Sequence, residues 1–351
     1  MKKIFAIMSI AAVTLFGVSC NPDLLNLDNP NALTAETAFN SEGDIDLALT
    51  GAYHSFYSSV NALLSGIQFS GLSDETTTMS NADIIAYLGL QFPNYSFKWN
   101  NSCWKQLYEQ IFRCNQVLTY AEENVTEWKK YDKTQITAQA RAIRAYDYFE
   151  LAMLYGKVPY IDWVSVAGDK PAEVSYETLC AKIVEDAKFA YENLPGSYFD
   201  GSCRSEYSNQ YRVTKWFAAC VLGKTYMNWN GQYDKALPYY EDIVKNGGFE
   251  LVADFNHNFN IPNENNKESI WEIQNYAAVN ASGRGAYDGW TNNSAVPDRS
   301  EWRWKFYALS PVGWNDVLPD DWTLYAFKNE KTVKDTPTTK AGQFDPRLEA
   351  T

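Results

Sequence analysis

Apolar side chains recur at the spacing of an α-helix through most of the first 250 residues of this 351-residue chain. The first such segment begins at Ser41, which together with Asp44 makes the pattern of a helix-capping box. The apolar positions that follow share one predicted helix face: Ile45, Leu49, Ala52 and Phe56. The pattern therefore predicts a helix that starts just after residue 41 and buries one side.

Further helices are predicted near 102–125, 134–155, 175–194, 215–229 and 233–247. Residues 145–155 are apolar almost all round, which is typical of a helix buried between neighbours. Gly156 is expected to end that helix, and Ser175 and Thr214 are expected to cap the next two.

The last two predicted helices carry part of a tetratricopeptide pattern. Residues 222–226 match its L-G-x2-Y element, and Ala236 and Tyr240 fit later positions after a one-residue insertion. Ala219 occupies the position of the motif's Trp. Helical hairpins that stack to bury a continuous core are therefore expected.

Helical periodicity is lost over residues 66–101 and again over 276–325. Both segments are polar and contain many aromatic residues, which favours functional loops or long connectors. Residues 249–252 and 269–274 are expected to form strands or turns.

The N-terminus has the pattern of an export signal. Lys2 and Lys3 precede an apolar run over residues 4–18, which is too short for a confident transmembrane span. Cys20 follows, in a context that resembles the lipobox of bacterial lipoproteins, although Gly17 stands where that motif usually has Leu.

Residues 1–19 are thus expected to be a lipoprotein signal peptide that is removed. Cys20 is then expected to carry acyl chains, whose buried CH₂ groups contribute roughly 0.8 kcal/mol each to membrane binding. Residues 20–35, rich in Asn, Pro and Leu, are expected to be a tether. The alternative is an ordinary secretory signal with a coincidental cysteine.

The formal charge of −13 narrows the choice of partners. An acidic surface repels nucleic-acid phosphates and anionic lipid headgroups, which argues against both as main partners. It suits a neutral ligand better than a polyanionic one.

Cysteine and histidine usage argues against a metal site, and no cofactor is predicted. The cysteines other than Cys20 are Cys103, Cys114, Cys180, Cys203 and Cys220, with no CxxC pair among them. Cys103 and Cys114 lie eleven residues apart in one predicted helix, too far apart to bridge. Most of these cysteines are expected to be small buried hydrophobes.

Catalytic motifs are equally scarce. H-E-x-x-H and G-x-S-x-G are absent from the sequence. Residues 223–225 imitate the end of a phosphate-binding loop, but Ala218 stands at the required first glycine and the segment is predicted to be helical. A glycoside hydrolase needs only two carboxylates, which 43 acidic residues permit by number, but no spacing singles out a pair.

One segment carries a specific family pattern. Residues 141–159 read RAIRAYDYFELAMLYGKVP, which resembles the R-A-x-x-Y-F-x-L-x-x-x-Y-G-x-V-P signature of the SusD/RagB family, outer-membrane nutrient-binding lipoproteins of Gram-negative gut and oral bacteria. Supporting matches lie at 49–53 (LTGAY), 104–115 (W-x3-Y-x2-I-x3-N), 270–274 (IWEIQ) and 345–348 (DPRL).

The resemblance implies a mainly α fold, with a tetratricopeptide-like helical-hairpin scaffold over 36–250 and an irregular, loop-rich, strand-poor ligand-binding region over 251–351. It implies a protein without catalysis that binds a glycan, or sometimes a peptide, at the cell surface. Such proteins sit as a lid on a TonB-dependent (SusC-like) outer-membrane transporter. Since family members usually continue past D-P-R-L, the sequence is also expected to be incomplete at its C-terminus.

The signature residues Arg141, Arg144, Tyr148 and Gly156 are expected to pack and form ion pairs instead of contacting ligand. Sugars need flat aromatic rings for their C–H faces and polar partners for their hydroxyls. The candidate platform rings are Tyr276, Tyr287, Trp290, Trp302, Trp304 and, from the early loop, Tyr87. The candidate polar contacts are Asn81, Arg284, Asp288, Asn292 and Arg299.

The alternative for these aromatics is that they bury a small core of the irregular region. Trp104 and Trp216, on predicted helices, are expected to be core, and Trp314 and Trp322 to be scaffold. Two other functions stay open: a protein-interaction or peptide-binding module, and an extracellular glycosidase.

Overall fold

The computed structural model describes residues 38–57, 76–77, 98–198, 211–259, 261–273 and 318–329. The helices are α3 (Glu42–His54), α7 (Lys98–Glu123), α8 (Lys133–Tyr155), α9 (Tyr176–Asn193), α10 (Lys215–Asn228), α11 (Tyr233–Asn246) and α13 (Asp321–Asn329). The 3₁₀ turns are η2 (Ser55–Tyr57), η4 (Phe255–Phe259) and η5 (Ile261–Asn263), and the strands are β1 (Thr76–Thr77) and β2 (Leu318–Pro319).

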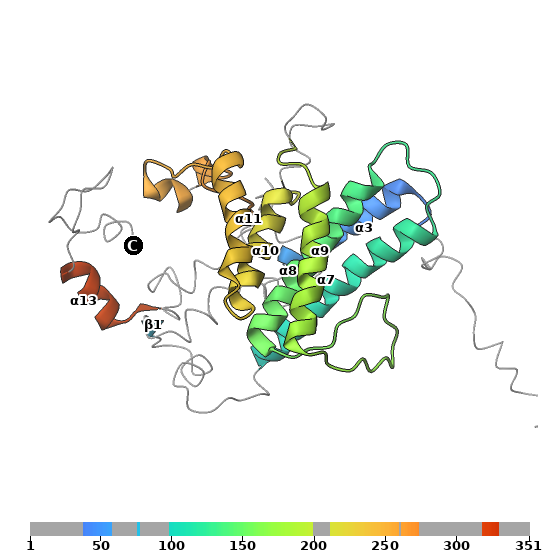
Figure 1. The fold of residues 1–351 in the computed structure, drawn as a ribbon, viewed down its shortest axis with the longest axis horizontal. Helices are drawn as coiled ribbons and strands as arrows, with labels where there is room; N and C mark the ends of the chain where they lie inside the picture. The colour runs from blue at the N-terminus through green and yellow to red at the C-terminus, as the bar shows by residue number, and fades with distance from the viewer. Residues whose placement is uncertain are drawn as a thin grey trace, which may run out of the picture.

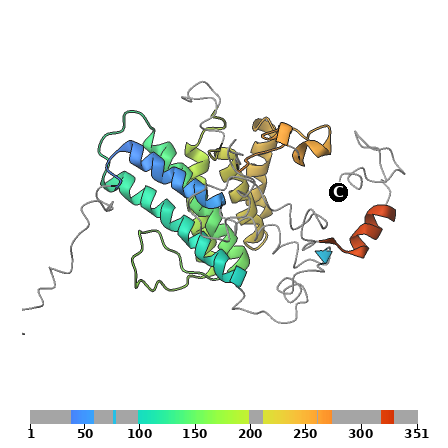
Figure 2. The same cartoon turned by 180° about the vertical axis from the view of Figure 1, so that it is seen from behind.

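The helices stack in chain order. Each of α7 to α11 packs on the next, and α3 lies against α7 and α8, which Figure 1 shows from the front and Figure 2 from behind. The fold is mainly α and tetratricopeptide-like, as the sequence predicts. None of the helices among the described residues is long and apolar enough to cross a membrane.

The capping box at the start of α3 is confirmed. The backbone N–H of Asp44 donates to the Ser41 hydroxyl at 3.2 Å, and the Ser41 N–H donates to the Asp44 carboxylate at 2.9 Å. The predicted apolar face is buried, with Ile45, Leu49 and Ala52 fully inaccessible. Local capping and a single apolar stripe therefore fix where this helix begins and which side it buries.

Gly156 ends α8 and Ser175 caps the start of α9, both as expected. Gly156 follows α8 with φ of 74°, a left-handed conformation that side chains disfavour. Ser175 caps α9 by accepting from the Thr178 N–H at 3.2 Å.

The expectation that the side chain of Thr214 caps α10 is wrong. Thr214 holds the N-cap position of α10, but its hydroxyl makes no capping bond and is buried without a partner in the part of the chain that the structure describes. The Phe217 N–H, which that hydroxyl would have to meet, donates instead to the Thr214 carbonyl at 3.1 Å. The tight backbone turn replaces the side-chain cap.

The tetratricopeptide pattern corresponds to the α10–α11 hairpin. Ala236 is buried, and Gly223 faces the ring of Tyr240 so closely that a Cβ atom would lie 2.5 Å from the ring Cζ. The motif's glycine is therefore required for the two helices to approach.

Cys103, Cys114 and Cys180 are buried and unbridged, and Cys220 is partly buried and unbridged. Burial raises the pKa of Cys180 to about 11 and that of Cys103 to about 12, so both thiols stay protonated and apolar at neutral pH. Cys203 lies outside the described residues.

Three expectations at the edges of the scaffold need correction. Helix α7 begins at Lys98, four residues before the expected start, and residues 321–329 of the expected irregular region form α13. Trp322 on α13 is 63% exposed, so it is not buried scaffold. The expectation of strands or turns at 249–252 and 269–274 agrees with the structure, whose described residues there form loops and turns held by bonds such as that from the Glu250 N–H to the Lys267 carbonyl at 3.0 Å.

We predict that Gly223→Ala destabilises the protein by about 1–3 kcal/mol, because the new methyl forces the Tyr240 ring out of its packed position. Thermal or urea unfolding measures the change, and Tyr240→Leu in the same chain should recover part of it. Gly51→Ala is the matched control, since its Cβ meets nothing within 4 Å in α3. It should be neutral or stabilising by up to about 1 kcal/mol. Equal losses for the two variants would contradict this account.

Candidate functional site

A buried guanidinium joins three helices at the centre of the stack. Arg144 on α8 donates through Nε and Nη2 to both carboxylate oxygens of Asp186 on α9, at 2.7 and 2.9 Å. Its Nη1 donates to the amide oxygen of Asn115 on α7 at 2.8 Å. Burial alone would lower the pKa of Arg144, but the Asp186 carboxylate reverses this and holds that pKa above its usual value.

The same network reaches the chain that follows α8. The side-chain amide of Asn115 donates to the carbonyls of Ile161 and Trp163, both at 3.0 Å. The hydroxyl of Tyr148 accepts from the Ile161 N–H at 2.7 Å and donates to the Ile161 carbonyl at 3.0 Å. Side chains of α7 and α8 thus supply hydrogen-bond partners to backbone groups of this connecting segment, which has no strand partner at those residues.

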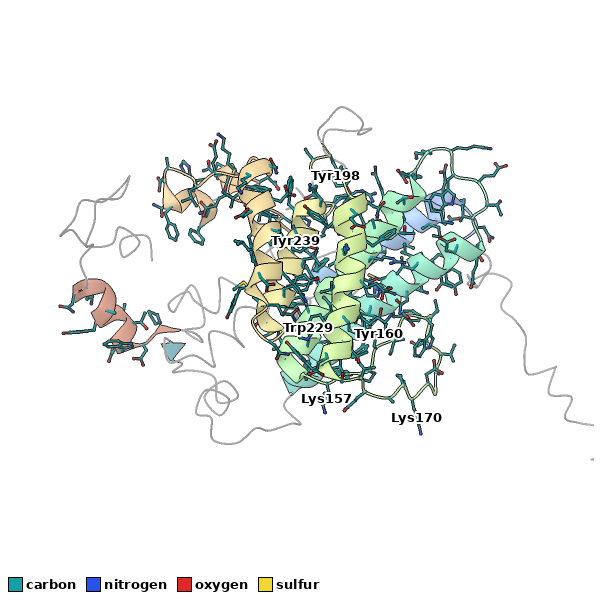
Figure 3. The ribbon with its side chains drawn as sticks, viewed as in Figure 1. Lys157, Tyr160, Lys170, Tyr198, Trp229 and Tyr239 are labelled. Atoms are coloured by element: carbon teal, nitrogen blue, oxygen red, sulfur yellow. The ribbon has the colours of Figure 1, made fainter. Side chains whose placement is uncertain are left out.

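These bonds anchor the base of residues 156–175, which we name the 156–175 loop. Tyr108 on α7 donates to the Pro159 carbonyl at 2.6 Å, and the Val174 N–H donates to the Val158 carbonyl at 3.0 Å. Figure 3 labels Lys157, Tyr160 and Lys170 along this loop, which extends from the ends of α8 and α9.

The tip of the loop has bonds of its own. Asp169 accepts from the Val166 N–H at 3.0 Å and from the Trp163 indole at 3.3 Å. The bond from Val166, with that from Trp163, lowers the pKa of Asp169. The loop is therefore tied at its base and at its tip.

The four signature residues have the structural roles expected of them. Tyr148 is fully buried, and Gly156 ends α8. Arg141 lies 3.8 Å from Asp186 and places its guanidinium 4.3 Å from the ring centroid of Phe189. The specific family pattern thus encodes packing and ion pairing.

A second core acid behaves differently from Asp186. Asp147 on α8 is fully buried, and neither carboxylate oxygen has a hydrogen-bond partner among the described residues. Burial raises the pKa of Asp147 well above its usual range, and the nearby Glu150 carboxylate adds to that effect. Asp147 therefore favours the neutral acid, whereas Asp186 is matched to a cation.

The anchored loop forms one wall of a pocket of about 290 Å³ against α7. Its lining is mostly apolar and aromatic: Trp104, Tyr108, Ile111, Phe112, Asn115, Pro159, Ile161, Ser165 and Pro171. The volume lies just below the roughly 300–1,000 Å³ usual for ligand pockets, so a single ring or side chain would fit.

This pocket was not foreseen from the sequence. Trp216 is core as expected, but Trp104 is only partly buried and lines the pocket beside Tyr108, with ring centroids 4.9 Å apart. The spacing of Trp104, Tyr108 and Phe112 on one helix was an available signal, since residues four apart share a face. The loop that completes the pocket could not be placed by spacing alone.

The predicted glycan platform lies outside the described residues. This applies to Tyr87, Asn81 and every candidate in 276–304, as well as to Trp314, Cys20 and the 20–35 tether. Those assignments therefore stay predictions. Among the residues that the structure describes, no three His, Cys, Asp or Glu side chains gather as a metal site.

Comparison with known proteins identifies the family. The SusD-like family, described as starch-binding and associating with the outer membrane, matches residues 23–227, more than half of the chain. The chain belongs to the SusD-like family. The signature helix α8 and its Arg144 network lie inside the matched range.

Named relatives agree with this assignment. A SusD-like protein of Bacteroides ovatus is 28% identical over 188 residues, covering 50% of this chain and 32% of that protein. SusD-like protein P2 of Formosa agariphila is 24% identical over 375 residues, covering 99% of this chain and 67% of that protein. The chain thus spans about a third of the first relative and two thirds of the second.

A solved structure shares the fold. Surface glycan-binding protein A from Bacteroides thetaiotaomicron, in complex with laminarihexaose, matches with a TM-score of 0.66 at 19% identity. The match covers 83% of this chain and 62% of that protein. At this identity it establishes the architecture alone.

We predict that Asn115→Ala loosens the 156–175 loop, because two loop carbonyls and Arg144 each lose a buried partner. Cleavage by trypsin after the exposed Lys157, followed by mass spectrometry, should speed up about tenfold, the factor that corresponds to 1.4 kcal/mol. Asn193→Ala is the control, since its amide only donates back to Phe189 within α9. A lower melting temperature with unchanged cleavage after Lys157 would show that Asn115 stabilises the core without anchoring the loop.

Proposed function

We propose that this protein is a cell-surface lipoprotein, without catalytic activity, that captures a glycan and delivers it to a partner TonB-dependent (SusC-like) outer-membrane transporter. The observation that carries the proposal is the SusD-like match over residues 23–227, in a family described as starch-binding and associating with the outer membrane. The helical-hairpin stack supports it, because the same fold occurs in a protein solved with laminarihexaose.

Attachment through Cys20 is part of this proposal. Acyl chains on Cys20 would hold the protein on the outer membrane, and residues 20–35 would let the helical stack move above its transporter. A tether suits a protein that must bind a large ligand and then close over a channel.

Glycan recognition is assigned to the aromatic and amide-rich loops. Trp290 and Trp302 would stack on sugar faces, while Arg284, Asp288 and Asn292 would bind hydroxyls. The formal charge of −13 favours neutral sugars.

A specific observation favours docking of a partner protein as a second candidate function. The pocket beside α7 is mostly apolar, and the anchored loop next to it exposes Trp163 (42%) and Val166 (68%). Rigid exposed apolar groups beside a pocket are typical of protein-binding surfaces. The two candidates are compatible, because a lid must hold both its ligand and its transporter.

We predict that the purified chain binds a neutral polysaccharide in affinity electrophoresis or calorimetry, and that Trp290→Ala with Trp302→Ala weakens binding about tenfold or more. Each lost stacking contact removes about 0.5–1.5 kcal/mol. Leu47→Ala, which removes a 70% exposed side chain on α3, outside the expected ligand-binding region, is the control and should bind like the unchanged chain.

The panel should contain laminarin, amylopectin, xylan and mannan, with peptides as a separate arm. Binding to peptides and to no glycan would refute the sugar assignment and leave the protein-docking candidate. Release of shorter sugars from any polymer would instead reveal a glycosidase.

A further inference from the structure

Three aromatic rings on the α10–α11 hairpin have nearly parallel planes. The ring planes of Tyr226 and Trp229 differ by 7°, with centroids 6.5 Å apart. Those of Tyr226 and Tyr239 differ by 11°, with centroids 6.1 Å apart. Figure 3 labels Trp229 and Tyr239 within the helical stack. We name these three residues the hairpin strip.

The polar atoms of the hairpin strip are not engaged by the described part of the protein. The rings of Tyr226, Trp229 and Tyr239 are partly buried, yet neither hydroxyl nor the indole N–H bonds to another described residue. None of these atoms is sealed from solvent. Three hydrogen-bond donors beside three flat rings are thus available to a ligand.

Other tyrosines in the stack differ in this respect. Tyr53 donates to Gln139, and Tyr191 donates to Asp242. A tyrosine that serves only packing normally gives its hydroxyl a protein partner when the ring is buried. The hairpin strip leaves part of each ring, together with its polar atoms, accessible to solvent.

The turn between α10 and α11 holds the hairpin strip in place. Asn230 and Gly231 have φ of 55° and 64°, which fixes a tight left-handed turn directly after Trp229. The Gln232 N–H donates to the Tyr226 carbonyl at 2.9 Å, and the Gln232 amide donates to the Trp229 carbonyl at 2.8 Å. The rings are therefore positioned before any ligand arrives.

Polar groups border the rings. The Lys235 ammonium lies 5.8 Å from the Tyr226 ring centroid and donates to the Gln232 amide at 2.6 Å. Asn228 is exposed at the end of α10. Flat rings with unengaged donors, surrounded by amides and one ammonium, match the alternating C–H faces and hydroxyls of a sugar chain.

We propose that Tyr226, Trp229 and Tyr239 form a second glycan-contact surface, on the helical scaffold and made of residues other than those of the predicted loop platform. The ligand class is a neutral polysaccharide, long enough to touch both surfaces. The proposal rests on the proposed glycan-binding function. Two linked contacts raise the affinity for a polymer well above that for a short oligosaccharide, because the second contact forms at high effective concentration.

The test measures the affinity of the full chain for laminarin, amylopectin, xylan and mannan, and for hexasaccharides of each, by calorimetry and affinity electrophoresis. Trp229→Ala should weaken binding to the polymer that the unchanged chain prefers by about fivefold, within the range for one lost ring contact. Its effect on the matching hexasaccharide should be smaller. Tyr239→Phe, which keeps the ring and removes only the unengaged hydroxyl, should weaken polymer binding by about twofold.

Two controls separate the hairpin strip from general effects. Met227→Ala removes a 43% exposed side chain between Tyr226 and Trp229 in sequence, and Leu47→Ala removes a 70% exposed side chain on α3. Both should bind polymer like the unchanged chain. If Trp229→Ala lowers the melting temperature strongly, Tyr239→Phe decides the question.

Suppose that the original chain binds glycan and that Trp229→Ala and Tyr239→Phe bind the polymer equally well. That result would overturn the glycan-contact role of the hairpin strip and leave the proposed function intact. A chain that binds no glycan at all would overturn both. Loss of binding to peptide or to a partner protein, with glycan affinity preserved, would reassign the hairpin strip to protein recognition and equally overturn the proposal.

Discussion

The buried pairing of Arg144 with Asp186 is the interaction on which the rest of the described structure depends. Burying two charges is costly, and their attraction offsets that cost only when geometry and the remaining hydrogen bonds are satisfied. Here both carboxylate oxygens meet the guanidinium fork, and the third donor goes to Asn115. Helices α7, α8 and α9 are thereby held in one register, because a shift of any of them would strand a charge or an amide in the core.

The register of these three helices also positions the segments around them. Asn115 and Tyr148 hydrogen-bond to the 156–175 loop, and the loop completes a pocket on α7. In the other direction, α9 supports α10 and α11, whose turn holds the hairpin strip. A scaffold that carries both an apolar pocket and an aromatic strip suits a protein that binds both a glycan and a transporter, as proposed.

Features set by local rules were predictable from the sequence. The Ser41 cap and the Gly156 stop follow from capping and backbone conformation, and Gly223 follows from the close approach of paired helices. Features set by distant neighbours were not. Thr214 is a residue type that caps helices, but the Phe217 N–H that its hydroxyl would bind donates to the Thr214 carbonyl instead. Trp104 lines a pocket only because the 156–175 loop folds back beside it. The family signature predicted the buried roles of Arg144 and Tyr148 but not the hairpin strip, whose parallel rings come from two helices. The loop platform is predicted from residue composition alone.

Arg144→Lys tests the central claim most directly, since lysine keeps the charge and loses the planar fork that reaches two helices at once. Native-state hydrogen exchange is the measurement, with the Ile161 amide as the reporter, because that N–H donates to Tyr148 inside the network. The account predicts that protection is lost at the Ile161 amide and weakened along the facing sides of α8 and α9, while the amides of α11 keep theirs. Unchanged protection at Ile161 in a folded Arg144→Lys chain would contradict it.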